Sequence, residues 1–284
     1  MIGITGANGQ LGLATIQFLL NNKTTPQSIV AIVRDQEKIK ALAKQGVLVC
    51  KADYNDYDSL VSAFRGVKKL LQISTTSIGE EGIRQERNVV KAAIENHIDH
   101  IIYTSSVQPK EKANFLATLQ SIETENAIKN SGINYTLFRN SLYMESIPGL
   151  IGNALNDGII NYPAQQGKVS FVSRTDIAEA LSIVLTTDGH LNKAYEITGL
   201  KVYDFSEIAT ILGQIKGRAF QYNSVSIDAY KNELRSFQLP EPVIELLVSM
   251  AMGIRSGEFS YVDDTLQTIL NRSPKTLDNY LESL

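Results

Sequence analysis

The chain has 284 residues, of which 43% are hydrophobic and 20% charged. These values are close to the averages of globular proteins and exclude long disordered stretches. Lys and Arg number 27 against 30 Asp and Glu, a formal net charge of −3, so we expect no nucleic-acid partner. The single cysteine excludes an intrachain disulfide.

Membrane and metal partners are not expected either. The longest apolar run, residues 243–254, is too short to span a bilayer and contains Glu245. Met1 is followed by a glycine-rich turn instead of the basic and apolar regions of a signal peptide, which favours a soluble, cytoplasmic protein. His97 and His100 lack nearby ligands at metal spacing, so we predict a solvated helix end there and no metal site.

The first 140 residues alternate between two kinds of pattern. Apolar runs predict strands at residues 1–5, 28–33, 47–52, 67–73, 100–104 and 134–138. The stretches between them predict helices at residues 10–20, 36–44, 57–64, 80–96 and 115–130. Strands of a parallel sheet read as apolar runs because helices cover both faces. The alternation therefore predicts an α/β fold with a doubly wound parallel sheet.

A glycine-rich loop joins the first predicted strand to the first predicted helix. Gly6 permits the tight turn, Gly9 lets the backbone approach a pyrophosphate, and Gly12 lets the helix pack closely on the sheet. The free N–H groups and positive dipole at the helix N-terminus attract phosphates. This motif, between a strand and a helix within one βαβ unit, predicts a dinucleotide-binding Rossmann domain.

The end of the second predicted strand bears on the choice of cofactor. Arg34 at this position would pair with the 2′-phosphate of NADP. The neighbouring Asp35 would favour NAD if its carboxylate pointed at the ribose. We predict NADPH because Arg34 is nearer the strand end, and a solvated charge at Arg34 is the remaining alternative.

The second half of the chain is more irregular, with frequent glycine and proline. Patterns there predict helices at residues 176–185, 205–215, 229–236 and 243–252, and strands at 194–198 and 220–225. We predict an NADP-binding Rossmann domain at 1–140 and a smaller, irregular substrate domain at 141–284, with 170–187 returning to the first domain's sheet.

Six segments occur in an order that resembles the NmrA-like branch of the atypical short-chain dehydrogenases, most of all its quinone-reducing bacterial members. These segments are ITGANGQLG, AIVRD, KADYND, YTSS, LFRNSLYMES and SRTDIAEA. The resemblance covers essentially the whole chain. It implies an NADPH-dependent oxidoreductase that acts on a quinone-like small molecule, and it implies no oligomeric state.

The resemblance also implies which residues form the site. Gly6, Ala7, Asn8, Gly9, Gln10, Leu11 and Arg34 would hold the phosphates, and Asp53 and Tyr54 would border the adenine. Ser74, Thr75 and Thr76 would line the cleft, and Asn140, Ser141, Leu142 and Tyr143 would lie near the nicotinamide, with Tyr143 also contacting the substrate. All these segments follow predicted strands, where ligands bind in open α/β sheets. Ser and Thr at such positions are also ordinary turn residues.

The catalytic pair of typical short-chain dehydrogenases is missing. Ser105 stands where their serine does, but no tyrosine has a lysine four residues later. Reducing an isolated ketone needs a positioned proton donor. A quinone instead accepts hydride to give a delocalised, weakly basic anion, so holding the two reactants in contact is sufficient. We therefore predict quinone reduction without a named catalytic residue; the alternative is a non-catalytic NADP-binding redox sensor of the NmrA type.

Overall fold

The computed structural model describes residues 1–284, which divide into two compact units. The first unit consists of Met1–Ser105, Gln120–Arg139 and Arg174–Tyr195. The second consists of Ser106–Leu119, Asn140–Ser173 and Glu196–Leu284. None of the helices combines the length and the apolar character that crossing a membrane requires.

A seven-stranded sheet with the order β3-β2-β1-β4-β5-β6-β8 organises the first unit. Its strands are β1 (Ile2–Ile4), β2 (Ile29–Val33), β3 (Leu48–Lys51), β4 (Lys69–Gln72), β5 (His100–Ser106), β6 (Asn134–Asn140) and β8 (Lys193–Ile197). The pairs β1–β2, β1–β4, β2–β3 and β4–β5 are all parallel. The predicted doubly wound parallel sheet is confirmed.

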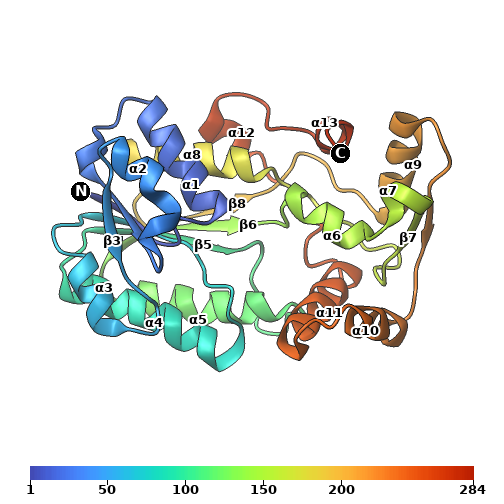
Figure 1. Ribbon diagram of the computed structural model, residues 1–284, viewed down its shortest axis with the longest axis horizontal. Helices are drawn as coiled ribbons and strands as arrows, with labels where there is room; N and C mark the ends of the chain where they lie inside the picture. Colours follow the sequence, from blue (N-terminus) through green and yellow to red (C-terminus); the bar gives the residue numbers. More distant parts are fainter. The chain divides into compact units, whose positions relative to one another are not determined.

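Helices cover both faces of this sheet, which explains why its strands are apolar runs. α1 (Gln10–Asn21) and α8 (Arg174–Thr186) pack side by side on one face. α3 (Tyr57–Ala63), α4 (Gly79–Glu95) and α5 (Leu116–Asn130) lie on the other (Figure 1). Every residue of β2 is buried, as expected of a strand enclosed between two helical layers.

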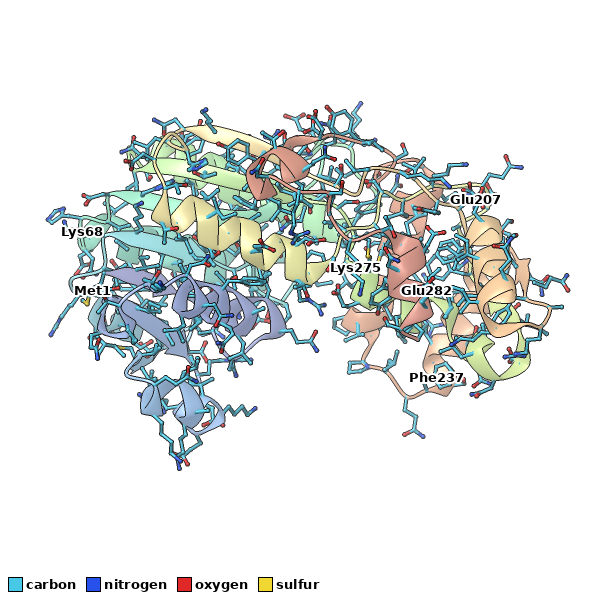
Figure 2. The ribbon with its side chains drawn as sticks, turned by 90° about the horizontal axis from the view of Figure 1, so that it is seen from above. Met1, Lys68, Glu207, Phe237, Lys275 and Glu282 are labelled. Carbon is cyan, nitrogen blue, oxygen red and sulfur yellow. The ribbon has the colours of Figure 1, made fainter.

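The direction of strand connection reverses at β1, which pairs with β2 on one side and β4 on the other. Met1 and Lys68 mark the amino ends of β1 and β4 (Figure 2), where the Lys68 N–H donates to the Met1 carbonyl oxygen at 2.8 Å. The loops after β1 and β4 therefore lie at the opposite, carboxyl edge. That edge, beside the reversal, is where open α/β sheets bind ligands.

The helix predicted at residues 36–44 is wrong in its extent. Gln36–Ile39 forms a 3₁₀ helix, η2, and α2 covers only Lys40–Lys44. Ile39 leaves helical geometry, with φ −126° and ψ 24°, and this interrupts the segment. The Asp35 carboxylate caps the start of η2 by accepting the Glu37 N–H at 3.1 Å.

His100 also differs from its prediction. Whereas His97 is exposed at the end of α4, His100 is buried on β5, with its Nε2 2.8 Å from the Thr136 hydroxyl. Burial, together with the positive charges of Lys69 and His190, lowers the pKa of His100 to about 4. His100 is therefore a neutral core residue, whose burial the short spacing from His97 did not reveal.

The second unit is mainly helical. It contains the two-stranded parallel sheet of β7 (Ile159–Asn161) and β9 (Gln221–Asn223). Its longer helices are α9 (Phe205–Lys216), α10 (Ile227–Ser236) and α11 (Glu241–Arg255), and its shorter helical elements are η3 (Met144–Ser146), α6 (Ile147–Ile151), α7 (Ala154–Asp157), α12 (Thr265–Leu270) and α13 (Leu277–Glu282). The prediction missed β7 and all of the shorter helical elements, because brief segments carry too few periodic positions to be detected.

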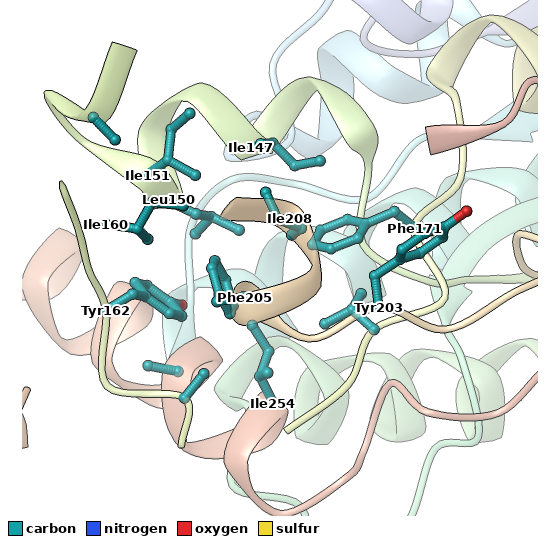
Figure 3. Close-up of a cluster of buried hydrophobic side chains, with 14 of the residues drawn as sticks. Ile147, Leu150, Ile151, Ile160, Tyr162, Phe171, Tyr203, Phe205, Ile208 and Ile254 are labelled. Carbon is teal, nitrogen blue, oxygen red and sulfur yellow. The ribbon is translucent and has the colours of Figure 1, made fainter. Parts of the chain in front are cut away.

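An aromatic cluster holds the second unit together. The Tyr162 ring packs 4.6 Å from the Phe205 ring and 5.3 Å from the Tyr230 ring, measured between centroids. Ile147, Leu150 and other aliphatic side chains of α6 and α9 surround this cluster (Figure 3). The second unit thus has its own hydrophobic core.

Candidate cofactor-binding site

A cavity of about 260 Å³ lies at the carboxyl ends of the strands in the first unit. Its walls come from the loops after β1, β2, β3 and β4, together with the side chain of one α4 residue. The lining residues are Gly6, Asn8, Gly9, Ile32, Val33, Arg34, Ala52, Asp53, Tyr54, Ile73, Ser74, Thr75, Thr76, Ser77 and Gln85. Loops that are far apart in the sequence thus converge beside β1, where the direction of strand connection reverses.

The glycine loop has the geometry that the sequence predicted. Gly6 adopts φ +60°, which glycine tolerates without strain, and its carbonyl oxygen accepts the Gly9 N–H at 2.9 Å. A Cβ on Gly12 would lie 2.7 Å from that same oxygen, so only glycine permits this packing of α1. Gly9 is the N-cap residue of α1 and offers no side chain to the first turn, whose N–H groups are left to bind an anion.

Arg34 borders the cavity at the end of β2 and is exposed. Its guanidinium group makes no hydrogen bond or ion pair within the protein, so its donors are free for a ligand. Asp35 does not line the cavity, because its carboxylate is occupied in capping η2. The arrangement favours a 2′-phosphate beside Arg34 over a ribose hydroxyl beside Asp35.

Asp53 and Tyr54 form the wall after β3. Asp53 accepts the Asn55 N–H at 2.8 Å and so shapes its own turn. The Tyr54 hydroxyl lies 2.7 Å from the Ile73 carbonyl oxygen and also contacts the Thr5 hydroxyl. Burial raises the pKa of Tyr54, so the ring presents a neutral surface to the cavity.

In the loop after β4, which lines the cavity, exposed and half-buried residues alternate. Ser74 and Thr76 are exposed, whereas Thr75 between them is half-buried. The Ser74 N–H donates to the Thr104 hydroxyl at 2.9 Å, which ties the loop to β5. Thr76 lines the cavity, and neither its hydroxyl nor its N–H bonds another protein group. Thr76 therefore offers polar groups to a ligand.

Three predicted residues of the glycine loop do not line the cavity. Ala7 is buried and donates its N–H to the Ile32 carbonyl oxygen at 3.3 Å, and Leu11 is a buried residue in the first turn of α1. The Gln10 side chain bonds Arg174. Conversely, the sequence did not point to Ser77 or Gln85, which also line the cavity. Ser77 could have been found as the next polar residue after Thr76, whereas nothing distinguished Gln85 within its helix.

The four residues predicted near the nicotinamide belong to the second unit. Ser141 is buried and its hydroxyl accepts a hydrogen bond from that of Ser170 at 3.1 Å. Leu142 packs against the core, and Tyr143 bridges Val172 in parallel. Asn140 differs from all three, because both polar atoms of its side-chain amide are buried without any hydrogen-bond partner.

We expect an Asn140→Leu variant to be more stable than the wild type and less active. Removing two buried, unsatisfied polar atoms should raise the free energy of unfolding by about 1–3 kcal/mol. If the amide is reserved for a ligand, kcat/KM should fall about tenfold or more. Urea denaturation and steady-state kinetics measure the two effects. A stabilised variant with full activity would show that the amide serves no ligand.

The Ser105 hydroxyl is hydrogen-bonded within a charge cluster that surrounds the buried Glu125 carboxylate. This hydroxyl donates to the Glu125 Oε1 at 2.7 Å, and Arg139 binds both oxygens of the same carboxylate at 2.9 and 2.8 Å. Lys129 adds a third partner at 2.9 Å. Burial raises the pKa of Glu125, but the bonds from Arg139, Ser105 and Lys129 lower it more, so the carboxylate stays ionised. The hydroxyl proton of Ser105 is thus engaged in a hydrogen bond to Glu125.

Taken as a cofactor site, the cavity suits the charges of NADPH. The uncapped first turn of α1 would hold the diphosphate, and the free Arg34 would hold the 2′-phosphate. Tyr54 would border the adenine, and Thr76 would contact the cofactor further along the cleft. Each of these groups is short of a protein partner or faces the cavity, as a ligand-binding group must.

Known proteins resemble the chain over its full length. The model of the NmrA-like family matches residues 1–281. Quinone oxidoreductase 2 of Escherichia coli is 37% identical over 98% of this chain and 96% of its own. The crystal structure of that species' NADPH-dependent quinone oxidoreductase with NADPH has a TM-score of 0.93 at 35% identity, covering 100% of this chain and 99% of that one.

A second enzyme is similarly related. The Citrobacter sp. triphenylmethane reductase complexed with NADP(H) superposes with a TM-score of 0.91 at 37% identity, covering 100% of this chain and 99% of that one. The glycine loop, the free arginine after β2 and these full-length matches agree with one another. On this evidence the chain belongs to the NmrA-like family, as its motifs predicted.

Proposed function

We propose that this protein is an NADPH-dependent reductase that transfers a hydride to quinones or similar conjugated acceptors. The observation that carries the proposal is the cavity in which an unpaired Arg34 lies beside an uncapped α1, in a chain 37% identical to a quinone oxidoreductase. The cytoplasm is the proposed location, since a reducing compartment suits the free thiol of Cys50.

The residues of the site act mainly by binding and orientation. The first turn of α1 and Arg34 would fix the phosphates, and Tyr54 would limit where the adenine lies. NADPH supplies the hydride when bound. Holding the donor and the acceptor in contact replaces a bimolecular encounter, which is a large part of catalysis in such a reaction.

Side-chain proton transfer has no evident donor. α5 carries no tyrosine, and the Ser105 hydroxyl is bonded to an ionised Glu125. A reduced quinone is a delocalised, weakly basic anion that solvent can protonate. We therefore propose that the chain needs no acid of its own for this acceptor class, in contrast to reductases of isolated ketones.

A steady-state assay of NADPH oxidation with a panel of quinones tests the proposal. Quinone-dependent oxidation of NADPH, with NADPH binding more tightly than NADH, supports it. A protein that binds NADPH but oxidises it with no quinone is a nucleotide sensor instead. A bound yellow flavin in the purified protein would contradict direct hydride transfer, because the chain has a single dinucleotide motif.

Tyr143 is the residue that we propose to pack against the acceptor ring. An aromatic face contributes about 0.5–1.5 kcal/mol beyond its buried area. Tyr143→Ala should therefore raise the KM for the quinone about two- to tenfold with a smaller effect on kcat. Tyr143→Phe keeps the ring and should retain most of the turnover. Loss of all activity in Tyr143→Phe would instead identify the hydroxyl as an essential acid.

A further inference from the structure

Glu86 on α4 is a fully buried carboxyl group directly behind the cofactor cavity. Its Oε1 accepts the Thr75 backbone N–H at 2.9 Å and the Gln120 amide at 3.3 Å. Its Oε2 accepts the Gln72 amide at 3.2 Å. No cationic side chain pairs with it, so an acidic residue has been retained in the core at a cost in desolvation.

The partners of Glu86 indicate what this carboxyl group does. Thr75 belongs to the loop after β4, and the two residues on either side of it, Ser74 and Thr76, are exposed at the cavity. Turning the Thr75 N–H inward toward Glu86 leaves these neighbours facing outward. Of the three groups bonded to Glu86, the Thr75 N–H is the one that belongs to a cavity-lining residue.

One further hydrogen bond and one close approach fasten the same loop to α4. The Thr75 hydroxyl bonds the Gln85 side chain and also accepts the Ser77 N–H at 3.2 Å. A Cβ on Gly82 would lie 2.4 Å from the Ser77 carbonyl oxygen and 2.2 Å from the Gln120 Oε1, so the loop approaches α4 as closely as a glycine allows. One helix face, from Gly82 to Glu86, thus sets the shape of the loop.

We propose that Glu86 is a positioning residue for the cofactor: its buried carboxyl group holds the Thr75 amide so that Ser74 and Thr76 face NADPH. The inference rests on the proposed function, because it assumes that the cavity holds NADPH. Glu86 itself does not line the cavity and acts only through Thr75.

Two substitutions separate this role from simple packing. Glu86→Gln keeps an oxygen that can accept the Thr75 N–H, whereas Glu86→Leu has a similar size and no acceptor. We expect the NADPH Kd, measured by fluorescence titration, to rise about five- to tenfold in Glu86→Leu and less than twofold in Glu86→Gln. Hydrogen exchange at the Thr75 amide should accelerate only in Glu86→Leu. The matched control is Glu123→Gln on α5, which breaks an exposed ion pair with Arg87 of α4 and should change neither quantity.

The protonation of Glu86 provides a second measurement, the pH dependence of stability, which a purely packing role for this side chain would not change. Burial raises the pKa of Glu86, despite the hydrogen bond from Thr75 that lowers it, and Tyr103 and Tyr54 are the titratable groups nearby. The folded protein therefore holds this proton more tightly than the unfolded chain. The contribution of Glu86 to the free energy of unfolding of the wild type is fully present at low pH. It is lost as the pH rises through the pKa of Glu86 in the folded protein. The stability of Glu86→Gln relative to wild type should accordingly increase with pH.

The outcomes distinguish the two proposals. If wild type fails to bind NADPH, the proposed function and this inference both fall. If wild type binds NADPH and folded Glu86→Leu binds it as tightly, only this inference is overturned. Should Glu86→Leu not fold, Gly82→Ala pushes on the same loop through Ser77 without lining the cavity. An unchanged NADPH Kd in folded Gly82→Ala would also overturn the inference.

Discussion

A Gly9→Val variant is expected to fold and to lose NADPH binding almost completely. Gly9 has φ −75° and ψ 160°, a conformation open to any residue, so the backbone itself tolerates the change. The new side chain would project from the cavity wall, where the diphosphate approaches the first turn of α1. Isothermal titration calorimetry with NADPH measures the loss, and circular dichroism verifies the fold.

Gly9→Ala provides the graded control for this prediction. Its Cβ would lie 3.1 Å from the Gly6 carbonyl oxygen, a tight contact that a small movement relieves. We expect Gly9→Ala to weaken NADPH binding less than Gly9→Val does. Normal NADPH affinity in a folded Gly9→Val protein would mean that the diphosphate binds elsewhere, and the assignment of this cavity to the cofactor would fall.

Replacing Arg34 by alanine should weaken NADPH binding by about 10- to 150-fold and leave NADH binding nearly unchanged. The lost contact is a charge-assisted hydrogen bond, worth about 1.5–3 kcal/mol, to a phosphate that only NADPH carries. Arg34 bonds no other protein group, so its removal should not disturb the fold. Parallel titrations of both cofactors with each protein measure the selectivity.

The matched control is Lys38→Ala, in the adjacent η2. Lys38 is exposed and carries the same charge, but it does not line the cavity. Its removal should leave the ratio of NADPH to NADH affinity intact apart from a weak, salt-dependent effect. An equal loss of both cofactors in Arg34→Ala would instead assign Arg34 a structural role.

The fold and the phosphate-binding part of the site could be predicted because their signals are local. The central strands β1 and β2 are short apolar runs, and the glycine loop is one continuous segment whose residues act on their own backbone. The same holds for Arg34, which directly follows β2. Neighbours in the sequence are then neighbours in the site, and no knowledge of packing is required.

The direction in which side chains point was decided only by tertiary structure. By its sequence position, Asp35 competes with Arg34 as a ligand for the ribose. In the structure its carboxylate instead caps η2. His100, predicted to be solvated, turned out to be enclosed in the core. Both outcomes depend on how the following backbone turns and on what packs above it, which the identity of the residue does not specify.

The contact between Glu86 and Thr75 could not be predicted from the sequence. A glutamate in the middle of an amphipathic helix is ordinarily a solvated residue, and nothing in the sequence separates Glu86 from the exposed Glu80 and Glu81 of the same helix. The sequence by itself determined the doubly wound parallel fold, the glycine loop and the cation beside it. Only the packing of α4 against the loop after β4 decided that one of these carboxyl groups is buried against a backbone amide, because burial depends on segments that meet in space and not along the chain.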